Sequence, residues 1–185
     1  MTYSNMIMYR SIIFGILFLM SNSVFCQIKR NIDGVVLGET TRTEVKLHLS
    51  KKNIYTKEME DGRSLLGKGE YLYGGVIWDA AKYFFIGDIL YKVIFLKNYS
   101  FENTGKLNEK YLLIRNNLLK KYTKSKLPDS SAKIPNNLFI KGKTTTVEVQ
   151  KEECRHGDGD YNLLRLTYTD IELDKKAKKK DYDDL

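Results

Sequence analysis

The clearest hydrophobic pattern in the chain runs from Gly74 to Leu96, where two apolar stretches are separated by Gly87-Asp88. Glycine reaches the positive φ that a two-residue hairpin turn needs, so the pattern predicts two antiparallel strands. After the turn, one set of alternate residues is apolar or aromatic and the other is mostly apolar: Tyr91, Val93 and Phe95 against Lys92, Ile94 and Leu96. We therefore expect a central strand, covered by a helix on one face and partly exposed on the other.

Further strands are predicted on both sides of this hairpin. Ser64–Tyr73 leads into it through Gly74-Gly75, and its internal glycines, Gly67 and Gly69, indicate a weak strand or a bulge. Later segments with clean alternation should place one face on the core and one in water. They are Thr144–Glu153 and Tyr161–Leu173, with a short additional strand near Leu138–Lys141. The lead-in Ile28–Gly38 is expected to be extended, and the polar stretch Asn53–Arg63 to be a loop.

Two helices are predicted from their caps and spacing. Thr41 followed by Glu44 is a capping box, and it begins a short helix from about Thr41 to Lys52. The second helix has one apolar stripe over about four turns. The stripe consists of Leu107, Tyr111, Ile114, Leu118 and Tyr122.

These elements predict an α+β fold with helices packed on an antiparallel β-meander sheet. The order of one helix and three strands occurs twice, in 33–98 and 103–173, so one interpretation is a tandem repeat of that unit. We expect a single α+β domain over 27–173. The segment 174–185 has charged residues and no apolar period, which predicts a flexible tail.

The N-terminal residues 1–26 have the pattern of a secretory signal peptide. Arg10 precedes an apolar run of about ten residues and then Ser21-Asn22-Ser23. This run is shorter than the roughly 20 apolar residues that span a bilayer. Cleavage after Cys26 and cleavage after Ser23 both fit, and an uncleaved anchor is the alternative. Acylation of Cys26 in a lipoprotein is less favoured, because Phe25 stands where a small residue is usual.

The cysteine count favours a bacterial envelope. If Cys26 leaves with the signal peptide, Cys154 is the only cysteine and no internal disulfide can form. An exported protein held by its core alone fits a periplasmic or secreted bacterial protein better than an animal extracellular one.

Charge and composition limit the classes of partner. The 185 residues have a net charge of +8 and are 42% hydrophobic, which is enough for a real core. Positive charge of this size favours anionic partners. Much of it lies in lysine runs rather than in an arginine-rich patch with interleaved aromatics, which argues against specific nucleic-acid recognition.

The first helix and its approach carry a resemblance to a known group of proteins. The run from Gly34 to Leu49 contains Gly38, the capping pair Thr41 and Glu44, and the apolar Val45. It resembles small envelope proteins of the outer-membrane-assembly lipoprotein and β-lactamase-inhibitor-protein-like type over about residues 33–96. The resemblance implies helices on an antiparallel meander and a binding or assembly role without catalysis. It carries over no functional residue.

The sequence contains no clear catalytic or cofactor motif. His48 lies beside the apolar stripe of the first helix and is expected to be a packing residue. The segment Cys154–Asp160 mixes thiol, imidazole and carboxylates, but its glycines are typical of a hairpin tip rather than of converging metal ligands. We therefore expect no enzyme activity, no metal and no cofactor.

Aromatic residues crowd the first two strands of the predicted meander, and some of them should face outward. The candidate interaction surface consists of Tyr71, Tyr73, Trp78, Tyr83 and Phe85. The sequence thus predicts an exported, non-catalytic envelope protein that binds another envelope protein or a glycan through a sheet face. The first alternative is a small-ligand module with a cavity between helix and sheet, and the second is an enzyme of unknown type.

Overall fold

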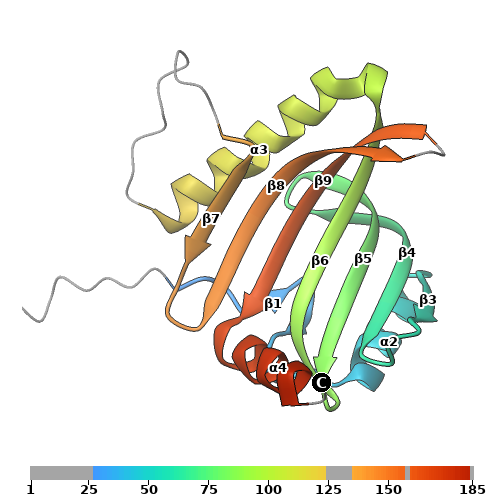
Figure 1. Ribbon diagram of the computed structural model, residues 1–185, viewed down its shortest axis with the longest axis vertical. Helices are drawn as coiled ribbons and strands as arrows, with labels where there is room; N and C mark the ends of the chain where they lie inside the picture. Colours follow the sequence, from blue (N-terminus) through green and yellow to red (C-terminus); the bar gives the residue numbers. More distant parts are fainter. Residues whose placement is uncertain (1–26, 124–134, 157–158, 184–185) are drawn as a thin grey trace, which may run out of the picture.

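The computed structural model describes residues 27–123, 135–156 and 159–183. The predicted signal peptide, residues 124–134, the tip at 157–158 and residues 184–185 lie outside the described residues. The described chain is an α+β fold in which one antiparallel sheet of seven strands is flanked by helices (Figure 1). The predicted fold class is therefore confirmed.

The strands lie in the spatial order β3-β4-β5-β6-β9-β8-β7. They are β3 (Tyr55–Glu58), β4 (Ser64–Tyr73), β5 (Val76–Ile86), β6 (Ile89–Ser100), β7 (Asn137–Lys141), β8 (Thr145–His156) and β9 (Gly159–Asp170). The predicted turns join β4 to β5 and β5 to β6, and their glycines have positive φ. The two predicted halves meet in one sheet through the pairing of β6 with β9. A tandem repeat stays a prediction.

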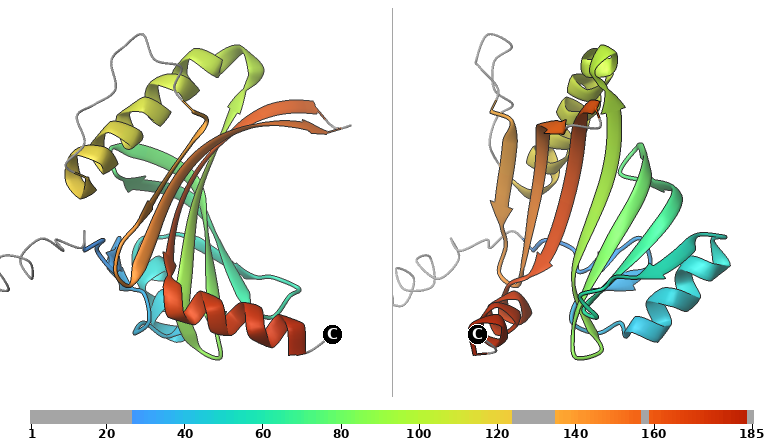
Figure 2. Two further views of the ribbon diagram at one scale, coloured as in Figure 1. Left: turned by 60° about the vertical axis from the view of Figure 1, so that its left-hand side comes forward. Right: turned by 45° about the vertical axis from the view of Figure 1, so that its right-hand side comes forward.

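Two helices and a small hairpin cover one face of the sheet (Figure 2). They are α2 (Arg42–Lys51), α3 (Thr104–Tyr122), and the hairpin of β1 (Asn31–Ile32) with β2 (Val35–Val36). All five residues of the predicted stripe on α3 are buried against this face. The predicted capping box is also present, since the Thr41 amide donates to Glu44 Oε2 at 2.7 Å and the Glu44 amide donates to Thr41 Oγ1 at 3.3 Å. The covered face holds the hydrophobic core.

Two bulges change which side chains face the core. One lies in β4 between Lys68 and Tyr71, as its glycines predicted. The other lies between the pairs Phe84–Lys92 and Phe85–Leu90, and it leaves Tyr91 without a partner across the ladder. The Tyr91 ring lies 6.3 Å from that of Phe84. The expectation that Tyr91 shares the covered face with its alternate neighbours is therefore wrong.

The charged C-terminal segment is a helix, not a flexible tail. The helix α4 (Ile171–Asp183) begins at Asp170, whose carboxylate accepts hydrogen bonds from the amides of Glu172 and Leu173. The helix is held to the sheet by ion pairs of Asp174 with Lys92 and of Asp181 with Arg63. The prediction for 174–185 missed this helix because its contacts are between charges rather than apolar residues.

The polar stretch expected to be a loop contains a strand, β3. Its four residues have no apolar alternation, and three of them are exposed. They pair with β4 through the backbone, from Tyr55 opposite Lys68 to Glu58 opposite Leu65. Glu58 also pairs with Arg42 and Lys46 of α2, at 2.7 and 2.6 Å, which fixes this edge of the sheet to the helix.

Candidate binding site on the open sheet face

The face of the sheet opposite α2 and α3 is left open over β6, β9, β8 and β7, and we call this region the open face. The strand register arranges its side chains in three rows that cross the four strands in that order. The rows are Lys92-Thr169-Thr146-Lys141, Ile94-Thr167-Glu148-Phe139 and Leu96-Arg165-Gln150-Asn137. Threonine hydroxyls and charges thus occupy the middle strands, and apolar groups lie at both ends of the second row.

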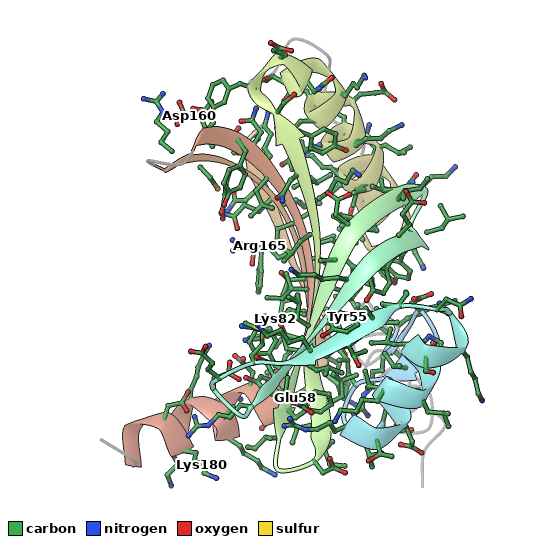
Figure 3. All side chains as sticks on the ribbon, turned by 90° about the vertical axis from the view of Figure 1, so that its right-hand side faces the viewer. Tyr55, Glu58, Lys82, Asp160, Arg165 and Lys180 are labelled. Atoms are coloured by element: carbon green, nitrogen blue, oxygen red, sulfur yellow. The ribbon has the colours of Figure 1, made fainter. Side chains whose placement is uncertain are left out.

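The helix α4 closes one end of the open face and makes it a groove. The groove has a volume of about 510 Å³. It is lined by Lys92, Ile94, Phe139, Lys141, Thr146, Glu148, Arg165, Thr167, Thr169, Ile171, Asp174, Lys175 and Lys178. Figure 3 shows Arg165 and Lys82 projecting from the sheet on this side, between the β8–β9 hairpin with Asp160 and α4 with Lys180.

Basic residues outnumber acidic ones in the groove. Its lining contains five lysine or arginine residues and two carboxylates, Glu148 and Asp174. Asp174 is already neutralised by Lys92 at 2.7 Å and Lys178 at 2.8 Å. Arg165 pairs with Glu152 at 3.0 Å, further along the strands. Lys175 likewise pairs with Glu172 at 2.9 Å, so most of the basic side chains have a carboxylate partner and the positive charge available to a bound molecule is centred on Lys141.

Two charged residues of the groove make no ion pair with any residue that the structure describes. Lys141, at the end of β7, is exposed, and Glu148 is half-buried in the middle of the face. They belong to neighbouring rows, so a cation and a carboxylate are both available to a bound molecule. Beside them Phe139 is 56% exposed, so its ring is available to a bound molecule.

The ion pairs around α4 lower the pKa of its carboxylate. Burial alone would raise the pKa of Asp174, but hydrogen bonds from Lys178 and Lys92 outweigh burial and hold the pKa below its ordinary value of 3.8. Asp174 is therefore ionised at neutral pH. Its charge keeps Lys92 and Lys178 beside the groove and fixes α4 to the sheet.

An aromatic and cationic cluster flanks the groove on β5. The ammonium groups of Lys82 and Lys92 lie over the Phe84 ring, at 4.8 and 5.6 Å from its centroid. Lys92 also lies 5.2 Å from the centroid of the Tyr91 ring. These contacts orient both lysines, so the positive surface continues from the groove across β6 to β5.

The aromatic surface predicted from the sequence does not exist. Tyr71, Trp78, Tyr83 and Phe85 are each at most 3% exposed and belong to the core. The register explains this, because Tyr71 pairs with Trp78 on the covered face and Tyr83 pairs there with Val93. Tyr73 is only partly buried, and it lines a cavity under α3.

The sequence predicted only part of the groove: the alternation within one strand, but not the order in which the strands pair. The alternation of Arg165 and Thr167 with apolar residues correctly indicated a partly exposed face on β9, but Thr169, predicted on the same face, is buried. It could not indicate that β9 lies between β6 and β8, which assembles the rows. The short strand predicted near Leu138–Lys141 is present as β7 (Asn137–Lys141), but its five residues could not indicate that Phe139 and Lys141 line a groove.

The two histidines, His48 and His156, were the candidates for catalytic or metal-binding chemistry. His48 is half-buried on α2, its Nε2 atom is buried without a hydrogen-bond partner, and its ring contacts Gly34. The side chain of His156 and the aspartate at 158 lie outside the described residues. Among the residues that the structure describes, no group of three or more His, Cys, Asp or Glu side chains could hold a metal ion.

No family model, curated protein or solved structure matches this chain. The resemblance to outer-membrane-assembly and inhibitor-like envelope proteins therefore stays a prediction. Within the described part of the chain, every helix is too short or too polar to cross a membrane.

Proposed function

We propose that this protein is an exported, non-catalytic protein of a bacterial envelope that binds an acidic segment of another envelope protein on its open face. The observation that carries the proposal is the groove beside α4, where five basic residues outnumber two carboxylates and one of these carboxylates is already paired. Export rests on the N-terminal sequence pattern.

Charge complementarity favours a polypeptide rich in Asp and Glu. The unpaired ammonium group of Lys141 can pair with a carboxylate of the partner, as can Lys175, whose present pair with Glu172 is on the surface. Charge-assisted hydrogen bonds of this kind contribute more than neutral ones and also accelerate association.

Apolar contacts favour a protein over a simple polyanion. Ile94, Ile171 and the exposed Phe139 lie among the charges, so a partner with apolar side chains between its acidic ones would bury them. An exposed aromatic that a partner can bury is the kind of residue that contributes strongly to binding energy in protein interfaces.

Defined probes test this proposal better than a cell extract does. We would measure fluorescence anisotropy with a short labelled peptide in which Glu and Leu alternate, with its Lys-Leu counterpart, and with a neutral oligosaccharide. The acidic peptide should bind, and high salt should weaken the binding without abolishing it, because the apolar contacts persist.

Two pairs of variants locate the binding. Lys141→Glu should weaken binding of the acidic peptide about tenfold or more, the scale of one charge-assisted contact. Its matched control, Lys143→Glu, makes the same charge change at an exposed residue outside the groove lining and should change the affinity less than about twofold. Phe139→Ala should also weaken binding, whereas Leu47→Ala, at an equally exposed residue on α2, should not.

Three results would refute the proposal. Equal effects of Lys141→Glu and Lys143→Glu would mean that only net charge attracts the peptide. Binding of the oligosaccharide but not the peptide would indicate that the groove recognises a glycan. Binding of neither probe would leave the groove without the proposed partner.

A further inference from the structure

A second cavity lies on the opposite side of the sheet, between the C-terminal half of α3 and the turn that joins β4 to β5. Its volume is about 410 Å³, within the range of small-molecule sites. Its walls are Leu113, Ile114, Asn117, Leu118, Lys121 and Tyr122 from α3, and Tyr73, Gly74, Gly75, Leu166 and Tyr168 from the sheet. The side chains in these walls are apolar or aromatic except for Asn117 and Lys121.

The floor of this cavity is an aromatic stack anchored in the core. The Tyr73 ring is stacked on that of Phe95, with centroids 4.7 Å apart and planes 12° apart. It meets the Tyr168 ring edge to face at 6.0 Å. Burial raises the pKa of Tyr73 and of Tyr168, so both hydroxyls stay protonated at neutral pH. The floor of the cavity is therefore an uncharged aromatic surface.

Two glycines form the turn side of the cavity. Gly74 and Gly75 both have positive φ, which the turn requires. A Cβ atom on Gly75 would meet nothing nearer than Leu113 Cδ2 at 3.7 Å, and one on Gly74 would meet nothing within 4 Å. The space between the turn and α3 is thus unoccupied by side chains rather than tightly packed.

The polar groups of the cavity select for negative charge. Lys121 is exposed, lies over the Tyr122 ring at 5.1 Å, and makes no ion pair with any residue that the structure describes. Asn117 precedes it by one turn of α3 and adds an amide donor. None of the lining residues that the structure describes is a carboxylate. A ligand with an apolar body and an anionic end would use both the walls and this cation.

We propose that this cavity binds a carboxylate amphiphile, with its hydrocarbon chain between α3 and the β4–β5 turn and its carboxylate at Lys121. A neutral hydrocarbon would leave Lys121 without a partner, and a small inorganic anion would leave the apolar walls empty. The site is separate from the open face, so neither proposal depends on the other.

The test compares decanoate with decan-1-ol by calorimetric titration of the purified protein, each below its aggregation limit. The two probes share a chain and differ in charge. Decanoate should bind about tenfold tighter, as expected for one charge-assisted contact. Decanoate should also shift the amide NMR signals of Gly74 and Gly75 more than those of Ile94 and Phe139 on the open face.

Variants distinguish the contacts with the hydrocarbon chain of the ligand from the contact with its carboxylate. Lys121→Glu should remove the preference for decanoate over decan-1-ol. Its matched control, Lys120→Glu, places the same charge one residue away, outside the cavity lining, and should keep the preference. Leu113→Trp, at an exposed residue of the wall, should weaken the binding of both probes by filling the cavity.

The proposal is overturned if decanoate does not bind, if it binds no tighter than decan-1-ol, or if Lys120→Glu acts like Lys121→Glu. It is also overturned if the NMR shifts fall on the open face. This last readout uses the unchanged protein, so it decides the question even if the Leu113→Trp variant fails to fold.

Discussion

The carboxylate of Asp170 joins the two ends of the described chain, and its removal should have a large effect on stability. This residue ends β9, and its side chain is only 8% exposed. Its Oδ1 atom accepts hydrogen bonds from the amides of Glu172 at 3.1 Å and Leu173 at 3.0 Å, which caps α4. Its Oδ2 atom accepts one from the Arg30 guanidinium at 3.1 Å.

The magnitude follows from these two roles. Loss of an N-cap costs about 1 kcal/mol. Loss of a hydrogen bond to a charged group costs about 1.5–3 kcal/mol, and we take about 2 because Arg30 is partly exposed to water. Asp170→Ala should therefore lower the free energy of unfolding by about 3 kcal/mol, or the melting temperature by roughly 6–12 °C for a chain of this size.

Asp170→Asn separates the two roles, since asparagine is an equally good cap but carries no charge. It should lower the free energy of unfolding by about 1.5–2 kcal/mol, and in an Arg30→Met background by much less. Glu172→Ala is the control, because this carboxylate is exposed and makes only a surface ion pair, with Lys175. The control should change stability very little.

The assay is urea unfolding followed by Trp78 fluorescence and circular dichroism. A decrease of less than about 1 kcal/mol in the free energy of unfolding of Asp170→Ala would contradict this account, because the substitution removes a buried carboxylate with three hydrogen-bond partners. It also fails if Asp170→Asn is as harmful with Met at position 30 as with Arg.

Three further predictions follow from single contacts. Trp78→Phe removes the indole donor to the Tyr73 carbonyl, at 2.9 Å, and should destabilise the protein by about 2 kcal/mol, measured by urea unfolding with circular dichroism detection. Acidification should detach α4 from the sheet. Folding lowers the pKa of Asp174, so the stabilisation that this carboxylate gives is present above about pH 4 and is lost as pH falls through its folded-state pKa. Hydrogen-exchange protection factors of the α4 amides would report the loss. Gly34→Ala places a Cβ 2.6 Å from His48 Cε1 at a φ of +91°, so thermal unfolding should show a loss of about 2 kcal/mol or more.

Each of these predictions can fail in a definite way. An unchanged stability of Trp78→Phe would mean that water satisfies the carbonyl. Protection of α4 that persists at pH 2 would mean that contacts other than the ion pairs of Asp174 hold it. Gly87 also has positive φ but has nothing within 4 Å of an added Cβ, so Gly87→Ala should cost less than Gly34→Ala, and the reverse order would contradict the steric argument.

The sequence predicted those elements whose signals are local. The Gly87-Asp88 turn and the alternation beside it placed β5 and β6, and the pair Thr41 and Glu44 placed the start of α2. These signals work because turn chemistry and capping depend on residues within a few positions of each other.

The failures share a cause, which is that their determinants lie far away in the chain. The helix α4 depends on Lys92, and β3 depends on the backbone of β4. The aromatic surface was predicted on the wrong face of the sheet. Alternation shows that Tyr83 and Phe84 point to opposite faces, but it does not show which face the helices cover. Phe84 is the residue that faces out, beside Lys82 and Lys92.

The pairing of β6 with β9 has a consequence for how the chain folds. Its ladder joins positions as distant as Lys92 and Thr169, so the sheet cannot be completed until nearly the whole chain is available. Folding with such non-local contacts is slow. Until β9 arrives, β6 is an edge strand with a free row of backbone groups and with Val93 and Phe95 on one side, a surface that favours self-association. A chain that ends before β8 should therefore aggregate, and during synthesis this strand needs protection until the last hairpin has emerged.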